Sequence, residues 1–412
     1  MRAAKVAVLM VASIYSIACG SDEGSKTSGA AGAPSAGAGA PASVAGAGGS
    51  PSAGAASGGA GSTSAGASSG TGGGGLQTPP GSTPSAMPII SHGVPAFSSG
   101  NAVNSTPGNA NDGKPEVAWN SNTGSGWLAY DLSAVSADQR KQVLIAWYDG
   151  AAPDFINPTP DASKHLPIDY KLEANPAAGG GNPPSDGWVP LAAVTDNDRS
   201  TRQHLVDLAG ANWVRMSVSK SSDPEAVGFD LDVHSAPDGG SDSWLFMGDS
   251  ITFQSTTYAF SDLPALVHGL APSRWPAIIP AGIGGTNTTS ALLAIDSTMS
   301  GFPGRFVILA YGTNDHANEY HMEELVQKVI AAGKTPVVPH MPWSATPNIQ
   351  TDGPLINKQI DDLYAKYPAI YHGPDLWAGF EGRTDLIPAN EIHPNGEGGA
   401  ELRKLWAAAM TK

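Results

Sequence analysis

The feature that most restricts the fold is an alternation, after Gly239-Gly240, of short apolar runs with segments of helical period. Spacing of apolar residues predicts helices over 322–330, 356–367 and 402–409, and Gly333 follows the first as a C-terminal glycine should. Such alternation is typical of a parallel sheet covered by helices on both faces. The sequence therefore predicts an α/β fold for residues 239–412. The five predicted strands are Trp244 to Met247, Ala277 to Ile279, Phe306 to Ala310, Thr335 to Val338 and Ala369 to Tyr371.

Residues 88–238 have a different pattern, in which short apolar or alternating runs are separated by turn residues without a helical period. Their spacing predicts an all-β sandwich or jelly roll. The chain is thus expected to fold as two domains, the second of them α/β. The predicted strands of the first domain are Trp127 to Leu132, Val143 to Tyr148, Tyr170 to Glu173, Trp188 to Ala192, Gln203 to Leu208, Trp213 to Val218 and Val227 to Val233.

The N-terminal residues read as targeting and linker sequence. Arg2 and Lys5 precede an apolar run that is too short to span a membrane, so residues 1–18 are expected to be a signal peptide. The segment that ends in Cys19 resembles the lipobox of bacterial lipoproteins, which implies lipidation of Cys19 and anchoring at the cell envelope. Residues 19–87 are rich in Gly, Ala and Ser and are expected to be a disordered tether.

The net charge and the cysteine content restrict the partners that the protein is expected to bind and the bonds that it can form. The formal net charge of -15 comes without a Lys/Arg cluster, which argues against a nucleic-acid partner. Contact with a membrane is expected only through the lipid anchor. Cys19 is the one cysteine, so an internal disulfide is excluded. No metal-ligand spacing occurs among the histidines, and we expect neither a metal nor a cofactor. The oligomeric state does not follow from the sequence.

Four segments that combine glycine with Asp, Ser, Asn or His lie where the predicted parallel strands end. In open α/β sheets ligands bind at that edge, so we expect the four segments to converge on one site. They are Gly248-Asp249-Ser250-Ile251-Thr252, Ala281-Gly282-Ile283-Gly284-Gly285-Thr286-Asn287, Gly312-Thr313-Asn314-Asp315 and Asn390-Glu391-Ile392-His393-Pro394-Asn395.

In order and spacing these four segments resemble the four blocks of the GDSL/SGNH hydrolases, a family of secreted esterases and deacetylases with a flavodoxin-like sheet. The resemblance implies that Ser250 is the nucleophile, that His393 is the base, and that Gly285 and Asn314 help to form the oxyanion hole with the N–H of Ser250. The chemistry agrees, because acyl transfer needs a hydroxyl beside a base and fixed donors for the developing oxyanion. Asp249 and Asp315 are expected to brace the loops.

The chain departs from the family at the acid of the triad. The family has Asp three residues before the histidine, and Asn390 stands there. An amide can orient the imidazole but brings no charge to stabilise the imidazolium. Three alternatives stay open: a Ser250-His393 dyad, which we favour; a substitute carboxylate from Glu391 or Asp385; or a domain that has lost activity. On the dyad hypothesis Asn390→Asp raises turnover without changing binding.

The first domain resembles discoidin, or galactose-binding-like, domains. The resemblance rests on Asn111-Asp112-Gly113 and on the segments around Trp127, Tyr170 and Trp213. It implies a sandwich that often binds glycans through loops at one end. Most of its tryptophans are expected to be core anchors, and only those on loops to contact a ligand.

Together these observations predict a secreted or surface-anchored serine esterase that hydrolyses short acyl esters, chiefly O-acetyl esters, on carbohydrates, with an acylated polysaccharide as its partner. Two alternatives are carried with it. One is an envelope lysophospholipase or thioesterase, which the expected lipid anchor suggests. The other is a non-catalytic glycan-binding lipoprotein, which Asn390 at the position of the acid suggests.

Overall fold

The structure is a computed structural model that describes residues 84–114, 118–149, 165–257 and 262–412. The predicted signal peptide, Cys19 and all but the last residues of the predicted tether lie outside these ranges.

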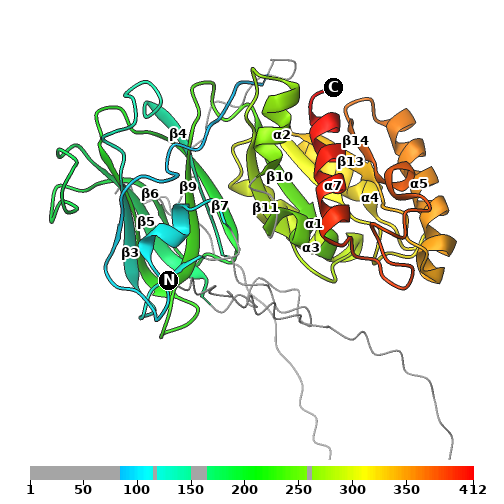
Figure 1. Cartoon of the computed structure of the whole chain (residues 1–412), viewed down its shortest axis with the longest axis horizontal. Helices are drawn as coiled ribbons and strands as arrows, with labels where there is room; N and C mark the ends of the chain where they lie inside the picture. The colour runs from blue at the N-terminus through cyan, green and yellow to red at the C-terminus, as the bar shows by residue number, and fades with distance from the viewer. Residues whose placement is uncertain (1–83, 115–117, 150–164, 258–261) are drawn as a thin grey trace, which may run out of the picture. The chain divides into compact units, whose positions relative to one another are not determined.

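The first part of the described chain is an antiparallel sandwich of two sheets (Figure 1). Successive side chains of a strand point to opposite faces of its sheet, so the apolar residues that face the interior recur at every second position. One sheet has the order β1 (Ala96–Ser98), β3 (Gly126–Asp131), β8 (Trp213–Ser221), β5 (Pro167–Asn175), β6 (Val189–Val194). The other has the order β2 (Trp119–Asn120), β9 (Gly228–Ser235), β4 (Gln142–Tyr148), β7 (Thr201–Asp207), and a 3-10 turn η1 spans Pro107–Asn111.

All seven strands that the sequence predicted in this part are present, and β1 and β2 are added to them. Trp119, Trp147 and Trp213 are fully buried, as core anchors should be. Trp127 and Trp188 are only partly buried.

The second part is a five-stranded parallel sheet in the order β11 (Ala277–Gly282), β10 (Ser243–Gly248), β12 (Phe306–Ala310), β13 (Thr335–His340), β14 (Tyr371–Asp375). The chain runs from β10 to β11 on one side and then crosses to β12 on the other. The switch point of the topology therefore lies at the carboxyl end of β10, where open α/β sheets bind ligands.

The predicted fifth strand is wrong in position, since β14 begins at Tyr371, where the prediction ended. Gly373 and Pro374 in β14 are turn-forming residues, so the sequence pattern stopped short of them. The edge position tolerates the proline. A Cβ on Gly373 would lie 2.7 Å from the backbone N of Pro339, so the close approach to β13 requires a glycine.

Helices cover both faces of the parallel sheet (Figure 1). Alternate residues of each strand face opposite sides, so Leu245 and Met247 pack with one set of helices and Trp244 and Phe246 with the other. The first set is α3 (Thr288–Ser300), α4 (Met322–Ala331) and α5 (Pro347–Lys366). The second set is α1 (Ser250–Thr257), α2 (Leu263–Leu270), α6 (Leu376–Phe380) and α7 (Gly396–Met410).

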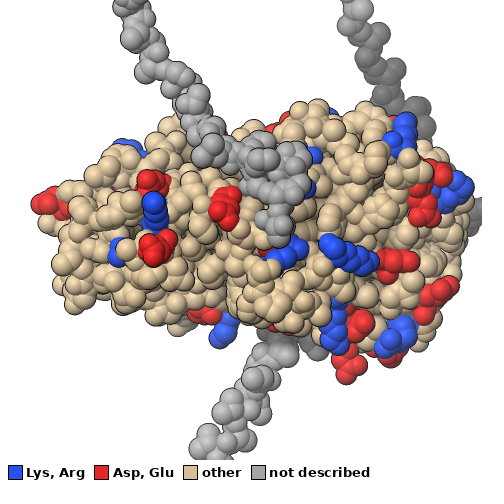
Figure 2. Space-filling model, turned by 90° about the horizontal axis from the view of Figure 1, so that it is seen from above, with Lys and Arg blue, Asp and Glu red and all other residues tan. Residues whose placement is uncertain are grey.

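The fold class predicted from the sequence, an antiparallel sandwich followed by a flavodoxin-like parallel sheet, is confirmed. On the face shown in Figure 2, acidic and basic side chains are scattered among uncharged ones. Among the residues that the structure describes, none of the helices combines the length and apolar character needed to cross a membrane.

Candidate active site

Ser250 lies at the turn from the central strand into a helix. β10 ends at Gly248 and α1 begins at Ser250, which leaves Asp249 as the single connecting residue. Asp249 ties the turn together, since its carboxylate accepts from the N–H of Ile251 at 2.9 Å. The first N–H groups of a helix have no acceptor within the helix, and Asp249 supplies one for Ile251 and Thr252.

Two glycines allow this turn to pack tightly. A Cβ on Gly248 would lie 2.7 Å from the carbonyl oxygen of Ala310 on β12. A Cβ on Gly282, at the end of β11, would lie 2.6 Å from the backbone N of Phe253 in α1. Both clashes involve the main chain, which a small rotamer change cannot relieve. The glycines of the first two sequence blocks therefore serve the approach of α1 to the strand ends.

His393 lies in the loop between α6 and α7, near the C-terminal end of the domain's sequence, and its side chain reaches Ser250. Its Nε2 is 2.8 Å from the Oγ of Ser250, a hydrogen-bonding distance for a nucleophile and its general base. Burial lowers the pKa of His393 from 6.5, and the negative charge of nearby Glu391 raises it to a smaller extent. The imidazole is therefore neutral near pH 7 and able to accept the serine proton.

None of the three residues considered for the acid hydrogen-bonds to His393 within the described part of the chain. Asn390 and Glu391 are exposed. Asp385 is bonded to Arg383 at 2.8 Å. Glu391 acts on the imidazole only through its charge. The structure thus shows a Ser250-His393 pair without a carboxylate bonded to the ring.

The two other blocks are joined to the serine turn by a chain of hydrogen bonds. Thr286 donates its hydroxyl to the carbonyl oxygens of Gly248, at 3.3 Å, and Ile283, at 2.7 Å. The side-chain amide of Asn314 donates to the carbonyl of Thr286 at 3.0 Å. The side-chain amide nitrogen of Asn314 carries two N–H groups, so its second N–H can donate to a substrate oxygen. Gly285, beside Thr286, is exposed and has a φ of 72°, a left-handed conformation that favours glycine.

Asp315 fixes the loop that carries the predicted oxyanion donors. Its Oδ1 accepts from the backbone N of Thr288 at 3.0 Å and from the Thr288 hydroxyl. The Thr288 hydroxyl in turn accepts from the N–H of His321 at 2.9 Å. Asp315 and Asp249 therefore brace loops, as the sequence suggested. Burial raises the pKa of Asp315, against the hydrogen bonds from Thr288.

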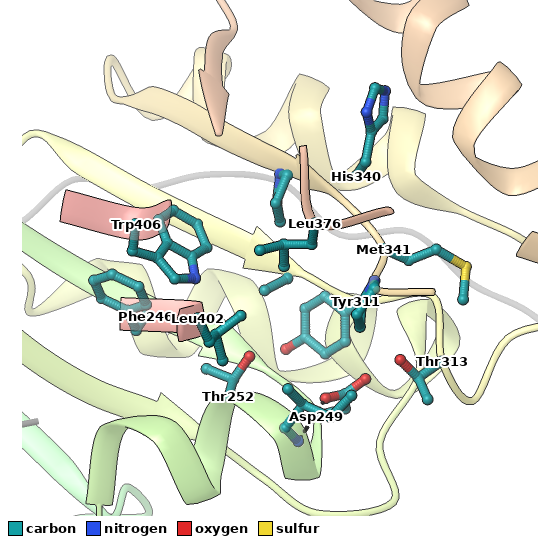
Figure 3. Close-up of a pocket in the computed structure, with 14 residues that line it drawn as sticks. Phe246, Asp249, Thr252, Tyr311, Thr313, His340, Met341, Leu376, Leu402 and Trp406 are labelled. Carbon is teal, nitrogen blue, oxygen red and sulfur yellow. Dashed lines mark hydrogen bonds between the residues drawn. The ribbon is translucent and has the colours of Figure 1, made fainter. Parts of the chain in front are cut away.

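Asp249, which precedes Ser250 in the chain, is buried and lines a cavity of about 30 Å³ (Figure 3). Burial raises the pKa of Asp249 to about 7, although hydrogen bonds from the backbone of Ile251 and Thr252 and from the Thr313 side chain lower it. A cavity of this size has room for about two water molecules. Neither Ser250 nor His393 lines it. The cavity therefore adjoins a carboxyl group that changes charge near neutral pH.

The remaining histidines of this domain have partners away from Ser250. His372 stacks on Tyr364 with ring centroids 3.8 Å apart. Within the described ranges no group of three or more His, Cys, Asp or Glu is arranged to hold a metal ion. The other contacts are His268 with the carbonyl of Arg274, His316 with Asp352, His321 with Glu324, and His340 with both Asp361 and Asp375.

Ser344 is a residue of this site that sequence reasoning missed. It lies just after β13, and its hydroxyl donates to the carbonyl of Glu391 at 2.7 Å. The same rule that singled out the ends of the first three strands also applies to the fourth strand. However, Met341-Pro342-Trp343-Ser344 has no glycine, Asp or Asn to attract notice.

Residues 246–400 match the model of the GDSL-like lipase/acylhydrolase family. This part of the chain, which contains the end of β10, the serine turn and His393, is therefore a domain of that family. A search of curated proteins finds no match to the chain.

Three of the solved structures that are similar to part of the chain illustrate the result. Chitosan-binding module 1 of a chitosanase/glucanase from Paenibacillus sp. IK-5 is 15% identical with a TM-score of 0.27, covering 35% of this chain and 98% of its own. Axe2, an acetylxylan esterase from Geobacillus stearothermophilus, is 17% identical with a TM-score of 0.36, covering 42% of this chain and 96% of its own. The lectin domain of lectinolysin, complexed with Lewis B antigen, is 12% identical with a TM-score of 0.25, covering 35% of this chain and 94% of its own.

Proposed function

We propose that this protein is a serine esterase that removes short acyl groups, chiefly O-acetyl groups, from carbohydrate. The observation that carries the proposal is the 2.8 Å contact between Ser250 Oγ and His393 Nε2 at the switch point of the parallel sheet. A hydroxyl beside a neutral imidazole at that edge is the minimum arrangement for nucleophilic acyl transfer.

In the first half-reaction, His393 Nε2 takes the proton of Ser250 as Oγ attacks the carbonyl carbon of the ester. The carbonyl π electrons move to oxygen and form a tetrahedral oxyanion. When the carbon–oxygen bond to the sugar breaks, the imidazolium returns the proton to the leaving alkoxide. An acyl-Ser250 ester remains. Water, deprotonated by His393, then attacks this ester and releases the carboxylic acid and the serine hydroxyl.

The oxyanion needs donors that are in place before the reaction starts. Backbone N–H groups of Ser250 and Gly285 and the free N–H of the Asn314 amide are assigned to it. The bond from Asn314 to the Thr286 carbonyl holds the amide at one fixed rotation. In this assignment Asn314 stabilises negative charge and takes no part in proton transfer.

The mechanism proceeds through a dyad. A carboxylate bonded to the ring would stabilise the imidazolium, and its absence from the described contacts of His393 lowers the driving force for proton transfer. Burial of His393 keeps the base in its neutral, active form near neutral pH.

A carbohydrate ester is the substrate that best explains the domain combination. The sandwich carries Trp188 in a loop just before β6, with its indole N–H held by the carbonyl of Pro184 at 2.9 Å. The guanidinium of Arg215 lies 4.1 Å from the centroid of this indole and pairs with Glu173 at 2.7 Å. A partly exposed aromatic ring with fixed polar neighbours suits a sugar ring, which presents both C–H and hydroxyl groups.

The test is hydrolysis of 4-nitrophenyl acetate, butyrate and octanoate by the full chain and by Ser250→Ala. Turnover of acetate that is lost in Ser250→Ala would support the esterase, and release of acetate from acetylated polysaccharide would support the carbohydrate specificity. Trp188→Ala is the matched variant for the sandwich. It should weaken retention on acetylated polysaccharide and leave 4-nitrophenyl acetate hydrolysis unchanged.

Other outcomes identify the alternatives. A clear preference for octanoate would favour an envelope lysophospholipase or thioesterase, because a shallow site loses rate as the acyl chain grows. Equal inactivity of the parent and Ser250→Ala on all three esters, with retained binding to polysaccharide, would favour a non-catalytic glycan-binding lipoprotein. Location at the cell envelope through lipidated Cys19 is part of the proposal, and incorporation of labelled palmitate, lost in Cys19→Ala, would test it.

A further inference from the structure

The dyad raises the question of what fixes the imidazole. In a triad the acid bonds to Nδ1 and orients the ring for the serine. Here the described contacts of His393 place its Nε2 on Ser250 and no side chain on Nδ1. Without that bond, the position of the ring depends on the packing around it and on the main chain that carries it.

That main chain is held on its N-terminal side by Ser344. The Ser344 hydroxyl donates to the carbonyl oxygen of Glu391 at 2.7 Å, two residues before His393. Ser344 is 2% exposed, so the donor end of this partly buried bond is shielded from solvent that would compete for it. Among the described residues, this hydrogen bond joins the β13–α5 loop to the histidine loop.

The Ser344 hydroxyl is itself held in one orientation. It accepts from the backbone N of Thr346 at 3.1 Å and lies 3.0 Å from the Thr346 hydroxyl. The carbonyl of Ser344 accepts from the side-chain amide of Gln350 in α5. With these groups acting as donors to the Ser344 oxygens, the single O–H of Ser344 is directed to Glu391.

The C-terminal side of the histidine loop is fixed separately. Asn395 donates its side-chain amide to the carbonyl of Asp385 at 2.6 Å, and its backbone N to the carbonyl of Leu386 at 2.9 Å. Its Oδ1 accepts from the N–H of Gly398 and caps α7. Hydrogen bonds thus fix the chain on both sides of His393. In the part of the chain that the structure describes, the bond from Ser344 comes from a different loop, whereas those of Asn395 stay within the α6–α7 loop and α7.

We propose that Ser344 is a positioning residue that holds His393 against Ser250 through the Glu391 carbonyl, in place of the bond that an acid would make to the ring. The proposal rests on the proposed function, since it concerns the same dyad. The described hydrogen bonds of Ser344 go to Glu391, Thr346 and Gln350 and not to Ser250, so its effect runs through the placement of His393.

The first experiment compares Ser344→Ala with Ser243→Ala in the full chain. Ser243 is an equally buried serine whose hydroxyl also donates to a carbonyl at 2.7 Å, that of Gly240, at the opposite end of β10. Displacing a base by a fraction of an ångström costs on the order of tenfold to a hundredfold in rate. We expect Ser344→Ala to lower kcat at least about tenfold with KM changed less than about twofold, and Ser243→Ala to leave both unchanged.

A double-variant cycle separates positioning from general damage. If Ser344 acts through His393, Ser344→Ala should not lower further the residual rate of His393→Ala, whereas Ser344→Thr, which keeps the hydroxyl, should recover most of the parent rate. Full activity of Ser344→Ala, or an equal loss with and without His393, would overturn the proposal. Inactivity of the parent chain would instead count against the proposed esterase itself.

Discussion

The Oγ of Ser250 and the Nε2 of His393 lie 2.8 Å apart, although 143 residues separate them in the chain. The serine comes from the end of the central strand and the histidine from the loop before the last helix. The pair exists only when the end of β10 and the loop before α7 have come together in the folded domain.

The pH profile should follow His393. Burial lowers its pKa below 6.5, and activity requires the neutral ring, so the acid limb of kcat/KM should have its midpoint below 6.5. Glu391→Gln removes the charge that raises this pKa and should move the midpoint still lower. Steady-state rates between about pH 4 and about pH 9 would show this. A midpoint above 6.5 in the parent would contradict the assignment.

Asn314→Ala should lower kcat by about 100-fold to 1,000-fold, because one oxyanion donor is lost. The variant also loses the bond to the Thr286 carbonyl, which costs about 1 kcal/mol of stability. Thermal unfolding measured beside the kinetics separates the two effects. A loss in kcat below about threefold in a folded variant would remove Asn314 from the oxyanion hole.

Gly398 and Gly396 offer a matched pair in the first turn of α7. A Cβ on Gly398 would lie 2.4 Å from the carbonyl of Leu386 and 2.9 Å from Pro394, the neighbour of His393. A Cβ on Gly396 would meet nothing within 4 Å. Gly398→Ala should therefore lower activity through the histidine loop. Gly396→Ala should keep activity and gain up to about 1 kcal/mol of stability, as alanine does in helices. Equal behaviour of the two in assays and thermal melts would refute this.

Asp249 should make folding less favourable as the pH rises. Its folded pKa is about 7 and its ordinary value is 3.8, so between these values the folded state holds a proton that the unfolded state has released. Its contribution to the free energy of unfolding falls by up to about 1.4 kcal/mol per pH unit in this window. Asp249→Asn should remove that slope in urea titrations. Identical slopes in parent and variant would show that Asp249 stays ionised in the folded protein.

Asn390→Asp tests the missing acid. A carboxylate three residues before His393 would favour the imidazolium, and exposed charges interact by up to about 1 kcal/mol. We expect kcat to rise by up to about fivefold with KM unchanged, and the acid limb to move to higher pH. Glu391→Asp, which keeps the charge next to this position, is the control. A variant no faster than the parent at any pH would show that orientation is already complete.

Much of this architecture could be predicted from local pattern. Period-2 runs predicted the seven longer strands of the sandwich, and the alternation of strands and helices predicted the parallel sheet. The very short β1 and β2 were missed because three or two residues carry no period. β14 was misplaced because Gly373 and Pro374 indicate a turn unless the backbone of Pro339 is known to lie beside them.

From the sequence alone, Ser250, Gly285, Asn314 and His393 could be predicted as the candidates for the chemistry, because the first three follow predicted strands and the last precedes a predicted helix. Only the tertiary structure decided how the histidine is held. Whether Asn390, Glu391 or Asp385 reaches the ring depends on side-chain directions in a loop, and the Ser344 bond joins two loops 47 residues apart. Local propensities act over a few residues, whereas such contacts exist only after the sheet has aligned its strand ends.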